Sequence, residues 1–194
     1  MRLKEIKKQK MNFIKLDLKK FDLLKKKLQK KKFDIIIHLA AQPGVRISQK
    51  YPNKTLDNNL KSFVNIFEFA KIIKPKLIIY ASSSSVYGNS KSFIEDISST
   101  SPVSIYGVSK LTNEYLSKVY NHLYQISSIG LRFFTVYGPY GRPDMSLFKF
   151  TKSIINFSKI DLFNNGNHER DFTYIDDVVN AIYRVLIKKN TKKI

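Results

Sequence analysis

Three short apolar runs constrain the fold of this chain more than any other feature of its sequence. They lie within 33–40, 77–83 and 128–134, and the first two are rich in consecutive isoleucines. Continuous apolar runs of this length are typical of strands that are buried on both faces of a parallel sheet. Helical patterns separate the runs, so the sequence predicts an α/β fold with parallel strands and right-handed crossovers.

The segments between these strands carry the periodicity and the end signals of helices. The expected helices are 19–30, 53–73, 103–125, 146–157 and 176–187. Short extended pieces are expected at 12–17, which alternates like a strand, and near 161–163 and 172–175. Loops are expected at 41–52 and 85–102, and a turn region rich in Gly and Pro at 137–144.

The composition narrows the classes of protein to consider. A chain of 194 residues can bury a sizeable core, and no apolar run reaches the roughly 18 residues of a membrane span. The sequence has no cysteine, which excludes disulfides and thiolate metal sites and fits a cytoplasmic protein. No cluster of histidines with carboxylates stands out, so we expect no metal site.

The formal net charge of +20 has two interpretations. The first is a compositional preference for lysine on solvated faces. The second is an electrostatic footprint for nucleic acid or for a membrane surface. The lysine runs within 25–32 contain no aromatic residues and no known nucleic-acid motif, so neither nucleic acid nor membrane is an expected partner. A basic surface could still attract a diphosphate ligand.

Tyr106 and Lys110 are four residues apart in an expected helix and therefore share one face. A phenol with an ordinary pKa of about 10 is a poor base at neutral pH, and a neighbouring ammonium favours the phenolate. Four serines, 82–85, stand where the second strand ends, which is where ligands bind in such sheets. Together these groups could remove a proton from an alcohol while a cofactor takes the hydride.

Four motifs follow one another in a defined order. They are His38-Leu39-Ala40-Ala41, the serine-rich strand end at 82–88, the Tyr106/Lys110 pair, and the run at 131–139. This order resembles the extended short-chain dehydrogenase/reductase family, and specifically its nucleotide-sugar epimerases and dehydratases. Gln42-Pro43-Gly44-Val45-Arg46 and the segment 141–145 are most similar to UDP-glucuronate 4-epimerases.

The resemblance implies NAD as cofactor and a UDP-sugar as substrate. Tyr106 would be the base, and Lys110 would lower its pKa and hold the nicotinamide ribose. Ser83 matches the catalytic serine, with Ser84 as a competitor. The implied cofactor contacts are Asp17, Leu18, Leu39, Ala40, Ala41, Asn59 and Phe134. The implied substrate contacts are Arg46, Ser83, Thr135, Arg142 and Arg170, with Arg46 and Arg142 as candidates for a sugar carboxylate.

Several of these residues also have an alternative interpretation as purely structural residues. The serines could form a polar strand exit, and Phe134 could be part of the core. Arg46 could be an ordinary surface residue, and Arg170 could pair with a neighbouring aspartate. His38 reads better as a structural strand residue than as a catalytic group.

The sequence departs from the family pattern at the phosphate-binding loop. The family opens with a strand, a Gly-x-x-Gly-x-x-Gly turn and a helix, and the 7 glycines of this chain form no such pattern. The expected fold is therefore a partial doubly wound, Rossmann-like sheet without its first β-α-β unit. We expect a truncated NAD-binding domain at 1–140, and a partial substrate-binding region with a returning Rossmann helix at 141–194. In isolation such a chain should bind NAD poorly.

The primary expectation for function is an NAD-dependent UDP-glucuronate 4-epimerase, with a homodimer implied by the resemblance. A UDP-glucose 4-epimerase and a nucleotide-sugar 4,6-dehydratase are alternatives. The similar dehydratases carry Asp-Glu after the catalytic Thr, where this chain has Ser84 and Ser85. An alternative of another class is an inactive remnant or a basic binding protein.

Overall fold

The structure is a computed structural model that describes residues 9, 11–90, 92–167 and 169–191. The chain divides into two compact units. We call Met11–Phe133 the sheet unit, and the unit that includes Phe134–Ile194 the C-terminal unit.

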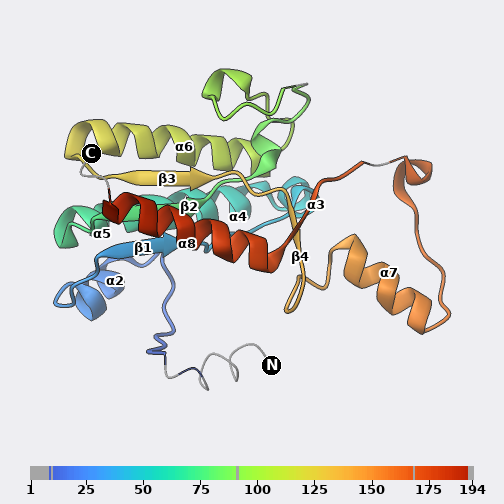
Figure 1. Cartoon of the computed structure of the whole chain (residues 1–194), viewed down its shortest axis with the longest axis horizontal. Helices are drawn as coiled ribbons and strands as arrows, with labels where there is room; N and C mark the ends of the chain where they lie inside the picture. The colour runs from blue at the N-terminus through green and yellow to red at the C-terminus, as the bar shows by residue number, and fades with distance from the viewer. Residues whose placement is uncertain (1–8, 10, 91, 168, 192–194) are drawn as a thin grey trace. The chain divides into compact units, whose positions relative to one another are not determined.

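The sheet unit is built on three parallel strands in the order β1-β2-β3 (Figure 1). The strands are β1 (Ile35–His38), β2 (Leu77–Ala81) and β3 (Ser128–Leu131). Ile35 lies opposite Leu77, and Ile78 lies opposite Ser128. The first four residues of β2 are buried, as its apolar run predicts for a central strand.

Helices connect these strands and cap their ends. They are α2 (Phe21–Leu28), α3 (Val45–Lys50), α4 (Pro52–Leu56), the π-helical η1 (Asp57–Lys61), α5 (Ser62–Ile73), the 3-10 turns η2 (Ser84–Val86) and η3 (Ile97–Ser99), and α6 (Ile105–Tyr124). Ser104 begins α6 by accepting the Gly107 amide at 3.0 Å. The left-handed Lys74, just before Pro75, ends α5.

The core of the sheet unit lies between α5 and the sheet. Phe63 and Phe67 pack on Ile78 and Tyr80 of β2, and partly buried residues of α6 join them. A second cluster joins Leu24 of α2 to α5. Apolar side chains on one face of each helix account for these contacts, so the amphipathic patterns place α2, α5 and α6 against buried neighbours.

The C-terminal unit has its own small parallel sheet. β4 (Thr135–Tyr137) pairs with β5 (Phe172–Tyr174), with Thr135 opposite Phe172. The helices of this unit are α7 (Ser146–Ile155), the 3-10 turn η4 (Phe163–Gly166) and α8 (Ile175–Thr191), which follows β5 directly.

The expected α/β class with parallel strands is confirmed, and three local expectations are wrong. The segment 12–17 is not a strand. Among the described residues β1 is hydrogen-bonded only to β2, so the segment has no neighbouring strand to pair with. The expected loop at 41–52 contains α3, which Ser48 anchors to α6. The segment 161–163 is irregular and leads into η4, and no strand of the described part pairs with it.

Across the described residues, no helix is both long and apolar enough to span a membrane.

Candidate functional site

The first turn of α6 lies directly against the serine turn that follows β2. A Cβ atom on Gly107 would lie 2.5 Å from the carbonyl oxygen of Ser85, so only glycine permits this approach. The Tyr106 amide donates to Ser48 Oγ at 3.1 Å, which ties the same turn to α3. The start of α6 is therefore fixed beside the carboxyl end of β2, where Tyr106 and the serines were expected to meet.

Lys110 is buried one helical turn after Tyr106. Its side chain is 4% exposed, and Nζ donates to the Ala81 carbonyl oxygen at 2.7 Å. Nζ lies 5.9 Å from the centroid of the Tyr106 ring. Burial lowers the pKa of Lys110 to about 8, since desolvation disfavours the ammonium. When charged, this ammonium favours the phenolate form of its neighbour Tyr106.

Ser83 and Ser84 lie where β2 gives way to the turn η2. Ser83 is buried, with an extended backbone, and its Oγ accepts the Ser85 amide at 3.1 Å. A hydroxyl that accepts one bond keeps its proton for donation, so Ser83 can serve a ligand oxygen. The backbone of Ser84 donates to the Phe133 carbonyl oxygen at 2.9 Å and joins this turn to the end of β3.

Asn59 connects the loop after β1 to the Tyr106 helix. Its Oδ1 accepts the Gln42 amide at 2.7 Å, and its Nδ2 donates to the Gln42 carbonyl at 3.2 Å and to Ser109 Oγ at 3.0 Å. Ser109 in turn donates to the Tyr106 carbonyl at 2.7 Å. Asn59 lies in the π-helical turn η1, and π-helical turns often occur at functional sites. Asn59 thereby holds the loop that contains the expected cofactor contacts.

A pocket of about 240 Å³ opens beside the carboxyl end of β1. Its lining includes Asp17, Leu18, Ala40 and Ala41, four of the residues that sequence reasoning assigned to a cofactor. Beside the pocket, Lys19 Nζ forms an ion pair with Asp57 Oδ2 at 2.6 Å. Leu39 lies next to this pocket in the chain and is 54% exposed. Small side chains beside a carboxylate suit the nucleoside end of a dinucleotide, so these residues fit NAD.

The expected substrate residues fall into both units. Arg46 lies on α3 in the sheet unit and is exposed. Thr135, Arg142 and Arg170 belong to the C-terminal unit, as does the expected cofactor contact Phe134.

Arg142 and Arg170, the two arginines of the C-terminal unit that were expected to contact substrate, already have partners in the chain. Arg142 forms a two-point ion pair with Asp144, whose carboxyl pKa this hydrogen bond lowers. Arg170 Nη1 donates to the Glu169 carbonyl oxygen at 2.7 Å.

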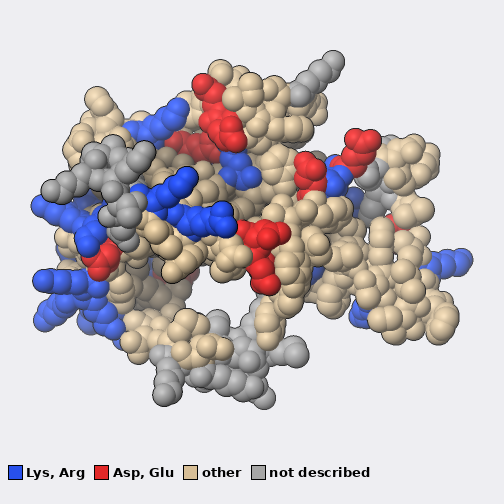
Figure 2. Space-filling view, viewed as in Figure 1, with Lys and Arg blue, Asp and Glu red and all other residues tan. Residues whose placement is uncertain are grey.

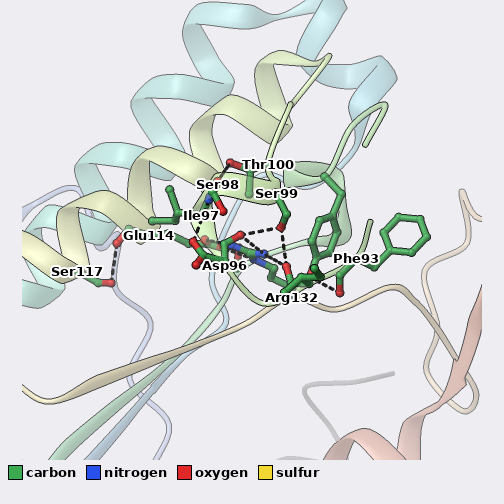
Figure 3. A network of polar contacts seen from close by, with 12 residues as sticks. Phe93, Asp96, Ile97, Ser98, Ser99, Thr100, Glu114, Ser117 and Arg132 are labelled. Atoms are coloured by element: carbon green, nitrogen blue, oxygen red, sulfur yellow. Dashed lines mark hydrogen bonds and ion pairs between the residues drawn. The ribbon is translucent and has the colours of Figure 1, made fainter. Parts of the chain in front are cut away.

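Sequence reasoning missed a buried polar network behind the serines. Arg132 forms a two-point ion pair with Glu114, through Nε to Oε1 at 3.0 Å and Nη2 to Oε2 at 2.8 Å (Figure 3). Ser82 donates its hydroxyl to the same Glu114. Glu114 follows Lys110 by four residues on one face of α6, and a carboxylate at that spacing was a readable signal.

His38 occupies the end of β1 and is 7% exposed. Its ring centroid lies 5.8 Å from that of Phe63. Burial, and then the charge of Lys110, lowers the pKa of His38 to about 4, so its ring is neutral at pH 7. This packing agrees with the structural interpretation of His38. The described residues contain no group of three or more His, Asp or Glu side chains that could hold a metal ion.

Comparisons with known proteins give a consistent result. Residues 2–194 match the NAD dependent epimerase/dehydratase family. The chain is 48% identical over 190 residues to Protein CapI of Staphylococcus aureus, covering 97% of this chain and 57% of CapI. It is 44% identical over 176 residues to UDP-glucuronate 4-epimerase 4 of Arabidopsis thaliana, covering 88% of this chain and 40% of that protein.

The structure also resembles solved epimerases. UDP-glucuronic acid 4-epimerase from Bacillus cereus, in complex with UDP-glucuronic acid and NAD, superposes with a TM-score of 0.85 at 33% identity. The match covers 100% of this chain and 61% of that one. This chain spans about half the length of the curated relatives it matches. The family expected from the motifs is confirmed: the chain belongs to the NAD-dependent epimerase/dehydratase family.

Proposed function

We propose that this chain carries the catalytic residues of an NAD-dependent nucleotide-sugar 4-epimerase that interconverts UDP-glucuronate and UDP-galacturonate. One observation carries the proposal: Tyr106, Lys110 and the serine turn meet at the carboxyl end of β2. The names of the relatives from Arabidopsis and Bacillus cereus support the choice of UDP-glucuronate.

The residues around the pocket of the sheet unit would hold NAD. Asp17 and Leu18 would contact its adenosine end, and Ala40 and Ala41 its middle. Leu39 would lie beside the same part of NAD as Ala40 and Ala41. Lys110 and Phe134 would contact the nicotinamide end. When bound, NAD supplies a hydride acceptor that later returns the hydride, so the reaction has no net redox change.

The protein's own part in the reaction is proton transfer and positioning. The Tyr106 phenolate takes the proton of the sugar 4-hydroxyl, and the Lys110 ammonium stabilises that phenolate. Ser83 donates a hydrogen bond to the same oxygen. After the 4-keto sugar has rotated in the site and its other face receives the hydride, Tyr106 returns the proton to the same oxygen, and C4 then has the opposite configuration.

The proposed substrate contacts are those that the family resemblance implies. Arg46 and Arg142 would bind the sugar carboxylate as two-point partners, with Thr135 on the sugar and Arg170 near the diphosphate. Arg142 is already paired with Asp144, and this pairing favours a second candidate, a UDP-glucose 4-epimerase acting on an uncharged sugar. The relative activity on the two sugars decides between them.

A homodimer is the partner that the exposed face of α6 supports. Val108, Tyr115, Val119 and Leu123 are all at least 45% exposed, and their spacing places them on one stripe of the helix. An apolar stripe of this kind can pair with the same stripe of a second copy about a two-fold axis.

The proposal is tested by incubating the full chain with NAD⁺ and UDP-glucuronate and separating the product sugars by chromatography. Tyr106→Phe is expected to lower kcat by about 10²- to 10⁴-fold, because the base is removed. Tyr124→Phe, at an exposed tyrosine of the same helix that lies outside the apolar stripe, is the matched control and should keep the wild-type rate.

Three outcomes would count against the proposal. Wild-type turnover by Tyr106→Phe would remove Tyr106 from the mechanism. Faster conversion of UDP-glucose than of UDP-glucuronate would favour the second candidate. Absence of both NAD⁺ binding and product would leave the inactive remnant as the better description of this chain.

A further inference from the structure

Two bonds from one face of α6 reach successive residues at the end of β2. Lys110 Nζ donates to the Ala81 carbonyl oxygen at 2.7 Å, and Glu114 accepts the hydroxyl of Ser82. The backbone of Ser82 donates to Leu131 of β3 at 2.8 Å. The residue that follows is Ser83. The end of β2 is therefore held by the helix that carries Tyr106 immediately before the serine that works with it.

Glu114 lies in the interior, and Arg132 is its ion-pair partner there. The side chains of Arg132 and Glu114 are 10% and 9% exposed, and two parallel hydrogen bonds join them. A buried carboxylate without such a partner would be strongly disfavoured. The two-point geometry also fixes the direction of the carboxylate, which leaves Oε1 facing Ser82.

Arg132 extends the same network to the segment before α6. Its Nη1 donates to the carbonyl oxygens of Ile94 and Asp96 at 3.1 and 3.2 Å (Figure 3). Its guanidinium carbon lies 4.8 Å from the centroid of the Tyr87 ring. A planar donor with this many partners is held in one orientation, and a lysine could not reproduce that arrangement.

We propose that Glu114 and Arg132 are positioning residues that act through Ser82 to set the distance and orientation of Ser83 relative to Tyr106. We call Ser82, Glu114 and Arg132 the Glu114 network. This inference rests on the proposed function for its kinetic consequences, while the contacts themselves are independent of it. No substrate or cofactor contact is assigned to these residues.

A purely structural ion pair and a positioning network make different predictions. Loss of a structural pair lowers the folded fraction and leaves the rate per folded molecule unchanged. Loss of positioning lowers kcat at nearly constant KM, because a displacement of about 1 Å at the reacting groups can cost about 100-fold in rate.

The most selective variant is Ser82→Ala, which removes the hydrogen bond from Ser82 to Glu114 and keeps the Glu114–Arg132 ion pair. We expect it to lower kcat about tenfold with KM for UDP-glucuronate changed by less than about twofold. Glu114→Gln keeps an oxygen for Ser82 and should lose about tenfold, whereas Glu114→Ala should lose about 100-fold. Circular dichroism gives the folded fraction of each variant.

The matched control is Glu68→Gln. Glu68 accepts the hydroxyl of Tyr120 at 2.7 Å, so it is a carboxylate bonded to α6 toward the far end of the helix from Tyr106. Its replacement should leave kcat unchanged. Wild-type kcat per folded molecule in both Ser82→Ala and Glu114→Gln would overturn the proposal.

Hydrogen exchange separates this proposal from the proposed function. In the wild type the amides of Ser84 and Ser85 are bonded to Phe133 and to Ser83 Oγ. Ser82→Ala is expected to speed their exchange several-fold, and Glu68→Gln is not. If the wild-type chain turns over no nucleotide sugar, the proposed function fails, and the exchange result still decides the network. Unchanged exchange in Ser82→Ala would then overturn it.

Discussion

Lys110 combines a buried position with a bond to the backbone of β2. Its burial lowers its pKa to about 8, and its charge contributes to keeping His38 neutral. The ammonium is therefore costly to the folded state while it is charged, yet that charge is what favours the Tyr106 phenolate. Under the proposed function, stability and proton transfer would place opposite demands on the same group.

This conflict gives a pH dependence with a defined sign. Between about pH 8 and 10.5 the folded chain has released the Lys110 proton while the unfolded chain keeps it. The unfolded state binds more protons in this window, so the free energy of unfolding rises with pH. We expect the wild type to gain about 1–3 kcal/mol relative to Lys110→Met between about pH 7 and pH 10.

Urea unfolding of both proteins at the two pH values measures the difference. Lys118→Met, an exposed lysine on the same helix, should follow the wild type. Parallel pH profiles for the wild type and Lys110→Met would show that Lys110 titrates normally.

Helix α6 depends on Gly107 for its distance from the serine turn. Alanine has the higher helix propensity by about 1 kcal/mol, so propensity alone predicts that Gly107→Ala stabilises the chain. The new methyl would meet the Ser85 carbonyl oxygen at 2.5 Å and Pro102 Cβ at 3.1 Å, so α6 must shift. We expect a net loss of about 1–3 kcal/mol in denaturant unfolding, together with a fall in kcat.

The control for this substitution is Lys118→Ala, which raises helix propensity at an exposed position of α6. It should leave stability within about 0.5 kcal/mol of the wild type. Greater stability in Gly107→Ala would mean that the first turn of α6 has room that the packing does not indicate.

The elements show which parts of the fold could be predicted from local sequence. Apolar runs such as Leu77–Ala81 can be predicted to be strands from local sequence, because consecutive β-branched residues favour strands. The segment 12–17 has the alternation of a strand, but a strand needs a neighbour, which local pattern does not supply. The π-helical turn Asp57–Lys61 was also missed, because helical periodicity continues smoothly across it.

The same distinction applies to the site. The placement of Tyr106, Lys110 and Ser83 beside the end of β2 could be predicted, because helix spacing and the strand end place them locally, while their roles stay predictions. The ties of Asn59 to Gln42 and of Arg132 to Glu114 join residues that are 17 and 18 positions apart, across different elements. Such contacts depend on tertiary packing, so the sequence pattern indicated neither.

Across the whole molecule, positive charge opposes association. The net charge is +20, and Figure 2 shows blue Lys and Arg side chains gathered over the side of the sheet unit that carries α2. Two such chains repel each other at low ionic strength, and salt screens this repulsion over a length of about 10 Å at 0.1 M. The apolar stripe on α6 favours association at any ionic strength, because burial of apolar surface does not depend on charge.

The proposed homodimer should therefore strengthen as salt is added. We expect sedimentation velocity to show a larger dimer fraction at about 300 mM than at about 30 mM salt, since the Debye length falls roughly threefold.

Val119→Glu puts a charge in the middle of the stripe and should be monomeric at both concentrations. Lys118→Glu, its neighbour, reduces the net charge and leaves the stripe intact, so it should dimerise at least as well as the wild type. A Val119→Glu variant that dimerises like the wild type would exclude this face, and a dimer that weakens with salt would show that charge pairs hold the interface.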